Sequence, residues 1–325
     1  QVADAICTFL ACAADKAADY NSRLCSWHNG RSVIRNTFER HDFHFKKSYA
    51  ENNLLATGVG YEWMLENVIT AYDDLRELSG GSSSPTDVYQ GDAADLPIDD
   101  NSIQAIVLDP PYYDNVMYSE LSDFFYVWMR KYLGDVYPDF FRNELSDKDR
   151  EAVANPSKFE GVATGDSSKS QLAKEDYEDM MTDIFSELHR VLSTDGVFTL
   201  MFTHKKTEAW DTLTSALIEA GFVVTATHPI NTESPLSLHQ AGKNSAESTM
   251  LLTSEKRGEA DDEYTLWSEI QNKTKTAARE KAEQLEEGDL DIAKVDVILA
   301  SFGPTLEVFT RNYPVVDDEG KKVPP

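Results

Sequence analysis

The chain has 325 residues, enough to bury a sizeable core as one large α/β domain with additions or as two modest domains. Its 57 Asp and Glu against 30 Lys and Arg give a net charge of −27, so the average surface repels phosphate. The acidic residues are spread through almost every segment, which is typical of halophilic proteins, and concentrated salt screens that repulsion. Three cysteines without a Cys-x-x-Cys pair, and no apolar run of membrane-spanning length, favour a reduced, cytoplasmic protein without a membrane anchor.

The first 85 residues predict a helical amino-terminal segment that contributes to the main body. Residues 2–24 and 61–78 both place apolar side chains at helical spacing. Between them lies a mixed stretch with a short expected strand near Phe43–Phe45. It holds the densest basic content of the first hundred residues: Arg31, Arg35, Arg40, Lys46 and Lys47. In so acidic a chain these residues are a candidate phosphate contact, and the alternative, charges that solvate a loop, stays open.

Residues 86–255 predict the α/β core. Val88–Gln90 is an expected strand that leads into Gly91-Asp92-Ala93. Ile106–Leu108 fits a buried parallel strand that stops at Asp109-Pro110-Pro111-Tyr112, because neither proline can donate to a sheet ladder. Two parallel strand ends, each presenting an Asp, would lie at the sheet edge where ligands bind in doubly wound folds.

The remainder of the core alternates helices and strands. We expect helices at 118–133, 177–192 and 209–220, and strands at 197–203, 222–226 and 248–253, with a mobile loop or lid near 155–175. The pattern predicts a Rossmann-like sheet with helices on both faces, with a final antiparallel hairpin as one alternative. Residues 256–325 predict a charged helical accessory tail, with helices at 263–287 and 295–302.

The tetrapeptide Asp109-Pro110-Pro111-Tyr112 has a specific chemical interpretation. A carboxylate such as that of Asp109 can accept a hydrogen bond from an exocyclic amine, and the Pro110 carbonyl can accept a second one. The prolines hold that carbonyl rigidly, while the ring of Tyr112 offers a face on which a flipped base can stack. No His or Cys spacing suggests a metal site.

The sequence resembles the adenine-specific DNA methylases that carry an inserted zinc ribbon and an amino-terminal domain of unknown function, within the S-adenosylmethionine-dependent amino-methyltransferases. The resemblance rests on segments spread over most of the chain: DYNSRL at 19–24, YAENN at 49–53, QGDAADLP at 90–97, DPPYYDNVMYSELSDFFYVWMR at 109–130, HRVLSTDGVFTLMFTHKKTEAWDTL at 189–213, HPINTES at 228–234 and FGPTLEVFTRNYPV at 302–315. Together with the acidic composition, it implies a halophilic archaeal source.

The resemblance implies roles for particular residues. Asp109, Pro110, Pro111 and Tyr112 would hold the target amine of adenine in DNA, and Gly91, Asp92 and Ala93 would contact S-adenosylmethionine. Tyr113 and Asn115, which continue the motif, are further candidate substrate contacts. His204 and Lys205 are candidates on a different ground: Thr203-His204-Lys205-Lys206 ends an expected strand at the ligand-bearing edge, where it could contact phosphate or the target strand, and the alternative, an ordinary basic turn, stays open.

The sequence also departs from the family. It has no Phe-x-Gly-x-Gly loop after a first strand and no zinc-ribbon cysteines. We therefore expect the chain to be the carboxy-terminal part of a longer enzyme, or one piece of a split one, with a sheet that could lack its first strands. Two further interpretations therefore stay open. The chain is a silent nucleic-acid-binding or assembly subunit that needs an amino-terminal half for cofactor binding, or it methylates RNA or a protein amide.

Overall fold

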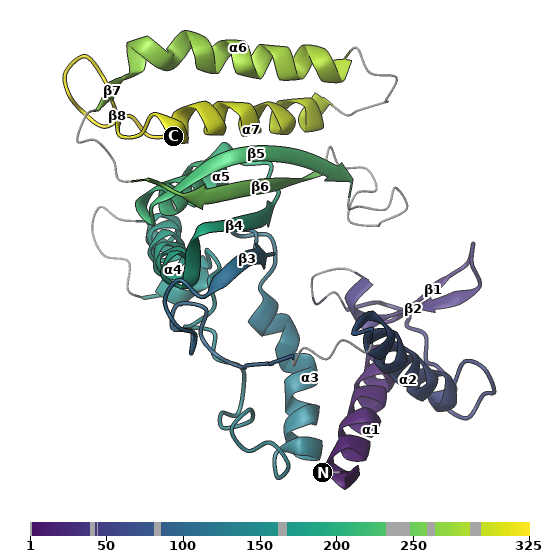
Figure 1. Ribbon diagram of the computed structural model, residues 1–325. Coiled ribbons are helices and arrows are strands. Elements are labelled where there is room, and N and C mark those ends of the chain that lie inside the picture. The colour runs from purple at the N-terminus through teal and green to yellow at the C-terminus, as the bar shows by residue number, and fades with distance from the viewer. Residues whose placement is uncertain are drawn as a thin grey trace. The chain divides into compact units, whose positions relative to one another are not determined.

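The computed structural model describes residues 2–39, 43, 45–80, 86–161, 168–231, 248–258, 264–286 and 294–325 (Figure 1). The chain divides into two compact units. Unit 1 comprises Gln1–Tyr89 and Met117–Glu151, and unit 2 comprises Gln90–Val116 and Ala152–Pro325. None of the described helices is long and apolar enough to cross a membrane.

Unit 1 is mainly helical. Helices α1 (Val2–Asp19), α2 (Tyr61–Leu78) and α3 (Tyr118–Leu133) confirm the three helices predicted for these segments. A hairpin of β1 (Ser26–His28) and β2 (Val33–Arg35) is followed by the short 3-10 helix η1 (Thr37–Glu39). Phe43 and Phe45 are in no strand, so the short strand expected near them is wrong. His44, between them, lies outside the described residues.

The end of α1 ties distant parts of unit 1 together. The Asp19 carboxylate accepts hydrogen bonds from the Thr37 backbone at 3.1 Å and from Asn36 at 2.8 Å. The Asn21 side chain accepts the Asn52 N–H at 2.9 Å. Two of the sequence segments that carry the family resemblance, DYNSRL and YAENN, are therefore neighbours in space.

Unit 2 is built on a four-stranded mixed sheet in the order β3-β4-β6-β5. Strands β3 (Ile103–Leu108) and β4 (Leu192–Phe202) are parallel, whereas β6 (Ser248–Lys256) runs antiparallel to both β4 and β5 (Phe222–Asn231). This confirms the predicted α/β class and the antiparallel final hairpin. A second, two-stranded sheet pairs β7 (Thr265–Leu266) with β8 (Val315–Val316).

Helices flank the main sheet on both sides (Figure 1). Alternate residues of β4, namely Phe198, Leu200 and Phe202, are fully buried in a core shared with α4 (Lys169–Val191) and α5 (Thr207–Glu219). On the side of β5 lies α7 (Lys294–Arg311), where Thr310 accepts the Val224 N–H at 3.0 Å. This bond satisfies a backbone donor at an otherwise unpaired sheet edge.

Two local expectations differ from the structure. Residues 86–90 form no strand, and Val88 is 89% exposed, because no described strand lies beside them to pair with. Helix α4 begins at Lys169, inside the expected loop, since Ser168 caps it by accepting the Gln171 N–H at 3.2 Å. Residues 162–167 of that loop lie outside the described residues.

The carboxy-terminal segment contains two helices, as expected, but the second is longer. Helix α6 spans Trp267–Glu286, and α7 continues through Pro304 to Arg311. At Gly303 a Cβ atom would overlap the Thr227 hydroxyl of β5. The glycine therefore permits a close approach of helix and strand that the dipeptide Gly-Pro alone does not reveal.

Candidate active site

The parallel pair β3 and β4 brings the predicted motif to the carboxyl edge of the sheet. Leu108, the last residue of β3, is in register with Leu200 of β4, so the two parallel strands end at the same edge of the sheet. Asp109 follows at once and is exposed, and its carboxylate has no hydrogen-bond or ion-pair partner among the described residues. Pro110 is buried. An acceptor side chain is thus presented to solvent on a backbone that is packed in place.

The chain then folds back in two tight turns. The Tyr113 N–H donates to the Pro111 carbonyl at 3.0 Å, and the Asn115 N–H donates to the Tyr112 carbonyl at 3.1 Å. Tyr113 adopts a left-handed conformation with a φ of 55°, which is uncommon for a bulky residue and costs on the order of 1–3 kcal/mol. Such strain persists only where the surroundings hold the residue, and here they include the Ala154 N–H, which donates to the Tyr113 carbonyl at 3.1 Å.

Tyr177 of α4 is the main internal support of the motif. Its side chain is fully buried, and its hydroxyl donates to the Pro111 carbonyl at 3.1 Å. Its ring packs edge-on against the ring of Tyr113, with centroids 5.2 Å apart. One residue in the core therefore fixes both the second proline and the strained tyrosine that follows it.

A charged network joins the loop after β3 to the loop after β4. The Asp114 carboxylate accepts a hydrogen bond from His204 Nε2 at 3.0 Å and pairs with Lys206 Nζ. The Lys206 N–H donates to His204 Nδ1 at 3.1 Å, so the neutral ring must carry its proton on Nε2. Only 2% of the surface of His204 is exposed, so the ring holds Asp114 from inside the fold, and its predicted contact with the substrate stays a prediction.

Burial and neighbouring charges set the protonation of this network. Burial lowers the pKa of His204 and outweighs the effect of Asp114, so the ring is held neutral. Burial alone would raise the pKa of Asp114, but Lys206 and His204 more than offset it, and the pKa is lowered. Burial, followed by the nearby Glu208, raises the pKa of Tyr113 to about 12, so its hydroxyl remains a proton donor.

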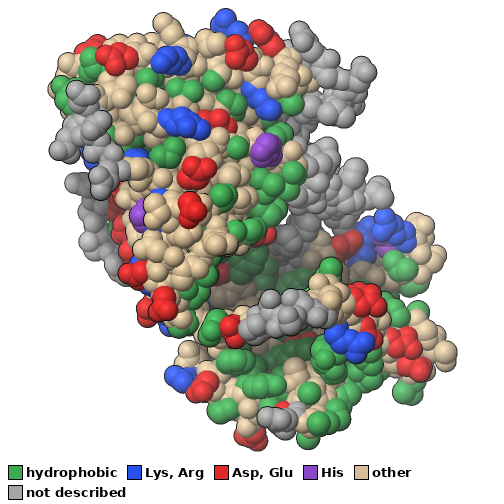
Figure 2. All heavy atoms as spheres, viewed as in Figure 1, with side chains coloured by type: hydrophobic (Ala, Val, Ile, Leu, Met, Phe, Trp, Pro, Cys, Tyr) green, Lys and Arg blue, Asp and Glu red, His purple; other side chains and the backbone are tan. Residues whose placement is uncertain are grey.

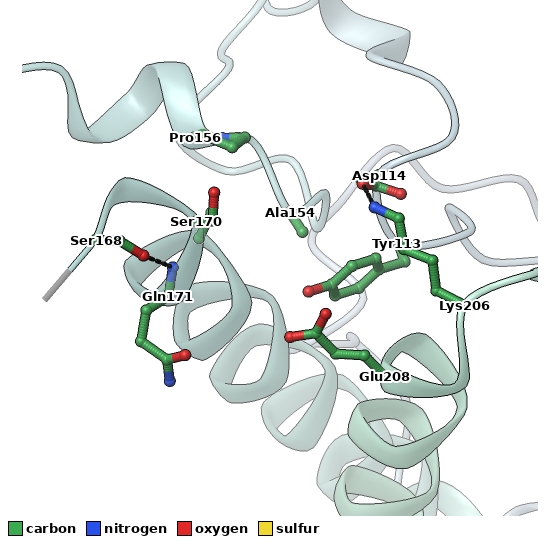
Figure 3. Close-up of a pocket in the computed structure, with 10 residues that line it drawn as sticks. Tyr113, Asp114, Ala154, Pro156, Ser168, Ser170, Gln171, Lys206 and Glu208 are labelled. Atoms are coloured by element: carbon green, nitrogen blue, oxygen red, sulfur yellow. Dashed lines mark hydrogen bonds and ion pairs between the residues drawn. The ribbon is translucent and has the colours of Figure 1, made fainter.

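A pocket of about 180 Å³ opens beside this network (Figure 3). Tyr113 and Asp114 line one wall, and Lys206 and Glu208 come from the start of α5. The carboxylate of Glu208 lies close to the Tyr113 ring in the close-up. The first turn of α4 and the segment before it complete the lining with Ala154, Pro156, Ser168, Ser170, Gln171 and Ala173. The volume is below the range of about 300–1,000 Å³ that small-molecule sites usually occupy, so the pocket alone cannot hold a whole nucleotide cofactor.

The remaining predicted site residues lie in different surroundings. Tyr112 packs edge-on against Phe202, with centroids 5.5 Å apart, at the margin of the core. Asn115 and Lys205 are exposed. Their roles, like those of Asp109 and Pro110, remain predictions.

The segment Gly91-Asp92-Ala93 is held near the opposite end of α4. The Asp92 carboxylate accepts the Ala94 N–H at 3.0 Å, and the Leu96 N–H donates to Glu187 at 2.7 Å. Tyr177 and Glu187 are ten residues apart on α4, which corresponds to about 15 Å along the helix axis. The two predicted parts of the site are therefore anchored at separate points of one helix.

Comparisons with known proteins give limited similarity. No protein-family model matches the sequence, and no curated protein sequence matches it. One solved structure with a similar arrangement is a protein from Thermus thermophilus described provisionally as a DNA modification methylase. It has a TM-score of 0.27 and 12% identity, over 59% of this chain and 61% of that chain. Another is the cyclase SpnF, with a TM-score of 0.26 and 14% identity, over 59% of this chain and 64% of that chain.

This chain spans less than two thirds of the length of each solved structure. Because both TM-scores are low, the two matches do not assign a function. The geometry of the site carries that argument.

Several residues of the site carry no signal in the sequence. Tyr177 looks like any aromatic residue on the buried face of a helix, and only its contact with Pro111 reveals its role. Glu208 belongs to a segment that is typical of an ordinary helix start. Lys206, by contrast, ends the basic segment 203–206, which the sequence places at an expected strand end. Asp114 lies two residues after the tetrapeptide, and that proximity is the one available clue. Among the described residues, no group of three His, Cys, Asp or Glu side chains is arranged to hold a metal ion.

Proposed function

We propose that this chain belongs to an S-adenosylmethionine-dependent methyltransferase that acts on the exocyclic amine of adenine in DNA. The observation that carries the proposal is the exposed Asp109 carboxylate, which directly follows β3 on a rigidly supported turn and has no partner in the part of the chain that the structure describes. Solvent-facing acceptors at the carboxyl end of a parallel strand occupy the usual ligand position of α/β sheets.

The residues of the motif suit the task of holding a planar amine. Asp109 accepts a hydrogen bond from one amine hydrogen, and the Pro110 carbonyl accepts the other, which orients the nitrogen lone pair away from both acceptors. Tyr177 keeps the turn from relaxing, because it holds the Pro111 carbonyl from inside the core. The neutral His204 keeps Asp114 in place without adding a cation beside the amine.

The methyl-donor side of the site is less complete. When bound, S-adenosylmethionine supplies an electrophilic methyl group. The Asp92 carboxylate already accepts a hydrogen bond from the Ala94 N–H in its own turn. At Gly91, no described atom lies within 4 Å of the position that a Cβ would take. The described residues thus fit the methyl acceptor and do not form a binding site for the methyl donor.

The direct test is methyl transfer from labelled S-adenosylmethionine, with DNA, RNA and protein offered as acceptors. We expect labelled DNA, and we expect Asp109→Asn to abolish the label while leaving the thermal unfolding of the protein unchanged. Label found only in RNA, or only in protein, would show that this molecule and not DNA is the substrate. Label that survives Asp109→Asn would refute the assigned role of the motif.

A second candidate function rests on the outer edge of β3. Within the described residues, β4 is the only strand beside β3, and Val107 of β3 is 77% exposed. An open strand edge invites pairing with another chain. In this alternative the protein is a subunit that binds cofactor only with a partner that supplies the glycine-rich loop. Calorimetry separates the two: the alternative expects no heat of cofactor binding by this chain alone.

A further inference from the structure

The basic stretch of unit 1 forms a defined surface. Residues 20–50 contain six Lys or Arg and two Asp or Glu, a net charge of +4 in a chain whose total is −27. The β1–β2 hairpin occupies the middle of this stretch, and Figure 2 shows a group of blue side chains where Figure 1 draws the hairpin. The local charge is thus opposite in sign to that of the protein as a whole.

Two segments that are separate in the sequence build this surface. The Ala50 N–H donates to the Cys25 carbonyl at 3.3 Å, so the end of the second segment lies beside the base of the hairpin. The guanidinium of Arg23 lies over the ring of Tyr49, 5.9 Å from its centroid. We define the hairpin surface as Arg23, Trp27, Arg31, Phe45, Lys46, Lys47 and Tyr49.

The cations of the hairpin surface have no acidic partner in the part of the chain that the structure describes. Arg23, Arg31, Lys46 and Lys47 form no ion pair with an acidic side chain among the described residues. By contrast, Arg35, on the same hairpin, is paired with Glu39 at 2.9 Å. Unpaired cations attract the phosphates of a polyanion, and each phosphate they neutralise releases counterions.

Large aromatic rings are exposed in the same two segments as these cations. Trp27 is 53% exposed, Phe45 77% and Tyr49 47%. Burial would normally recover free energy from rings of this size, and flat exposed rings beside cations are the arrangement on which unpaired bases stack. An acidic protein partner would satisfy the cations but would leave the rings without a matching flat group.

We infer that the hairpin surface binds a nucleic-acid strand with unpaired bases, with phosphates on its cations and bases on its rings. The inference rests on the proposed function, since it gives the DNA substrate a contact outside the catalytic motif. Such a contact would hold a strand whose target base is already free of pairing, which lowers the cost of presenting that base to Asp109.

The test is binding of a fluorescein-labelled single-stranded oligonucleotide, followed by anisotropy across a salt titration. We expect R31Q/K46Q/K47Q to reduce the slope of log affinity against log salt by about 2, at roughly 0.7 per phosphate contact on a single strand. Trp27→Ala should weaken binding about tenfold at an unchanged slope, because stacking on a ring involves no counterion release. The matched control, K273Q/K275Q/R279Q on exposed positions of α6, removes the same charge and should leave binding unchanged.

Three outcomes would overturn the inference. One is equal binding by the hairpin variant and the wild type, and another is preference for the duplex of the same sequence. The third is that the protein binds no oligonucleotide but associates with itself, in a salt-sensitive way that the hairpin variant abolishes. A second copy of this acidic chain would then be the ligand. Thermal unfolding of each variant excludes misfolding as the cause. Oligonucleotide binding is measured without cofactor or turnover, so a failure of methyl transfer would not affect the binding result. A failure of oligonucleotide binding would likewise leave the methyl-transfer result unaffected.

Discussion

Replacing Tyr177 by Phe tests whether support from the core keeps the motif competent. The substitution removes only the hydroxyl that donates to the Pro111 carbonyl at 3.1 Å and leaves the buried ring against Tyr113. The carbonyl keeps its second donor, the Tyr113 N–H at 3.0 Å, so it is not left unsatisfied. The expected cost is therefore that of one neutral hydrogen bond, about 1 kcal/mol in the free energy of unfolding.

Two measurements follow from that magnitude. Thermal unfolding should shift down by about 2–4 °C for a unit of this size. Methyl transfer should fall by about fivefold when the whole loss is expressed at the transition state, and it should fall in kcat rather than in KM, since binding groups are untouched. Tyr126→Phe is the matched control, because it removes a hydroxyl that donates to a carbonyl at 2.9 Å in unit 1. Equal kcat for Tyr177→Phe and wild type would refute the positioning role.

Three further predictions concern the motif, its network and the fold. Asp109→Asn should lower methyl transfer by roughly 10²–10³-fold, the usual effect of removing one preorganised polar partner, with unchanged unfolding. His204 has a lowered pKa in the folded protein, so its contribution to stability should be complete above about pH 6.5 and lost as the pH falls below that value, a trend that His204→Asn should flatten in denaturant titrations. Gly303→Ala should destabilise the protein by about 1–3 kcal/mol because the added methyl meets Thr227, whereas Gly258→Ala, with open space around it, should be neutral in the same titration.

The sequence was most informative where a periodic pattern was long. The three helices of unit 1 and the strands of the final hairpin follow from the spacing of apolar residues in the sequence, although α2 and α3 each contain a single buried residue, Met64 and Leu133. The position of the motif at Asp109 was also predictable, since two consecutive prolines cannot donate to a ladder and so end the strand before them. These features depend on local chemistry, which a sequence records directly.

Other features depended on contacts between distant residues. The two adjacent residues His204 and Lys205 look equivalent in the sequence as substrate contacts, yet the first is buried against Asp114 and the second is exposed. Helix α7 continues through Pro304, and Gly303 before it lies close to Thr227 of β5, a contact that depends on packing across the fold. The support from Tyr177 likewise exists only once α4 has docked on the sheet.

The failed prediction at Val88–Gln90 and the open edge of β3 have a common physical basis. A strand is stabilised by the ladder it joins, so a segment with strand-forming residues stays irregular when no neighbour offers backbone groups. Val88 and Val107 are both largely exposed, at 89% and 77%, although their residue type favours burial. Within the described residues the outer edge of β3 has no strand beside it, so an additional parallel strand could extend the ladder there. The end of such a strand would lie next to Asp109, at the edge where α/β sheets bind ligands. In the second candidate function, we therefore propose that a partner that pairs with β3 also supplies the binding site for the methyl donor.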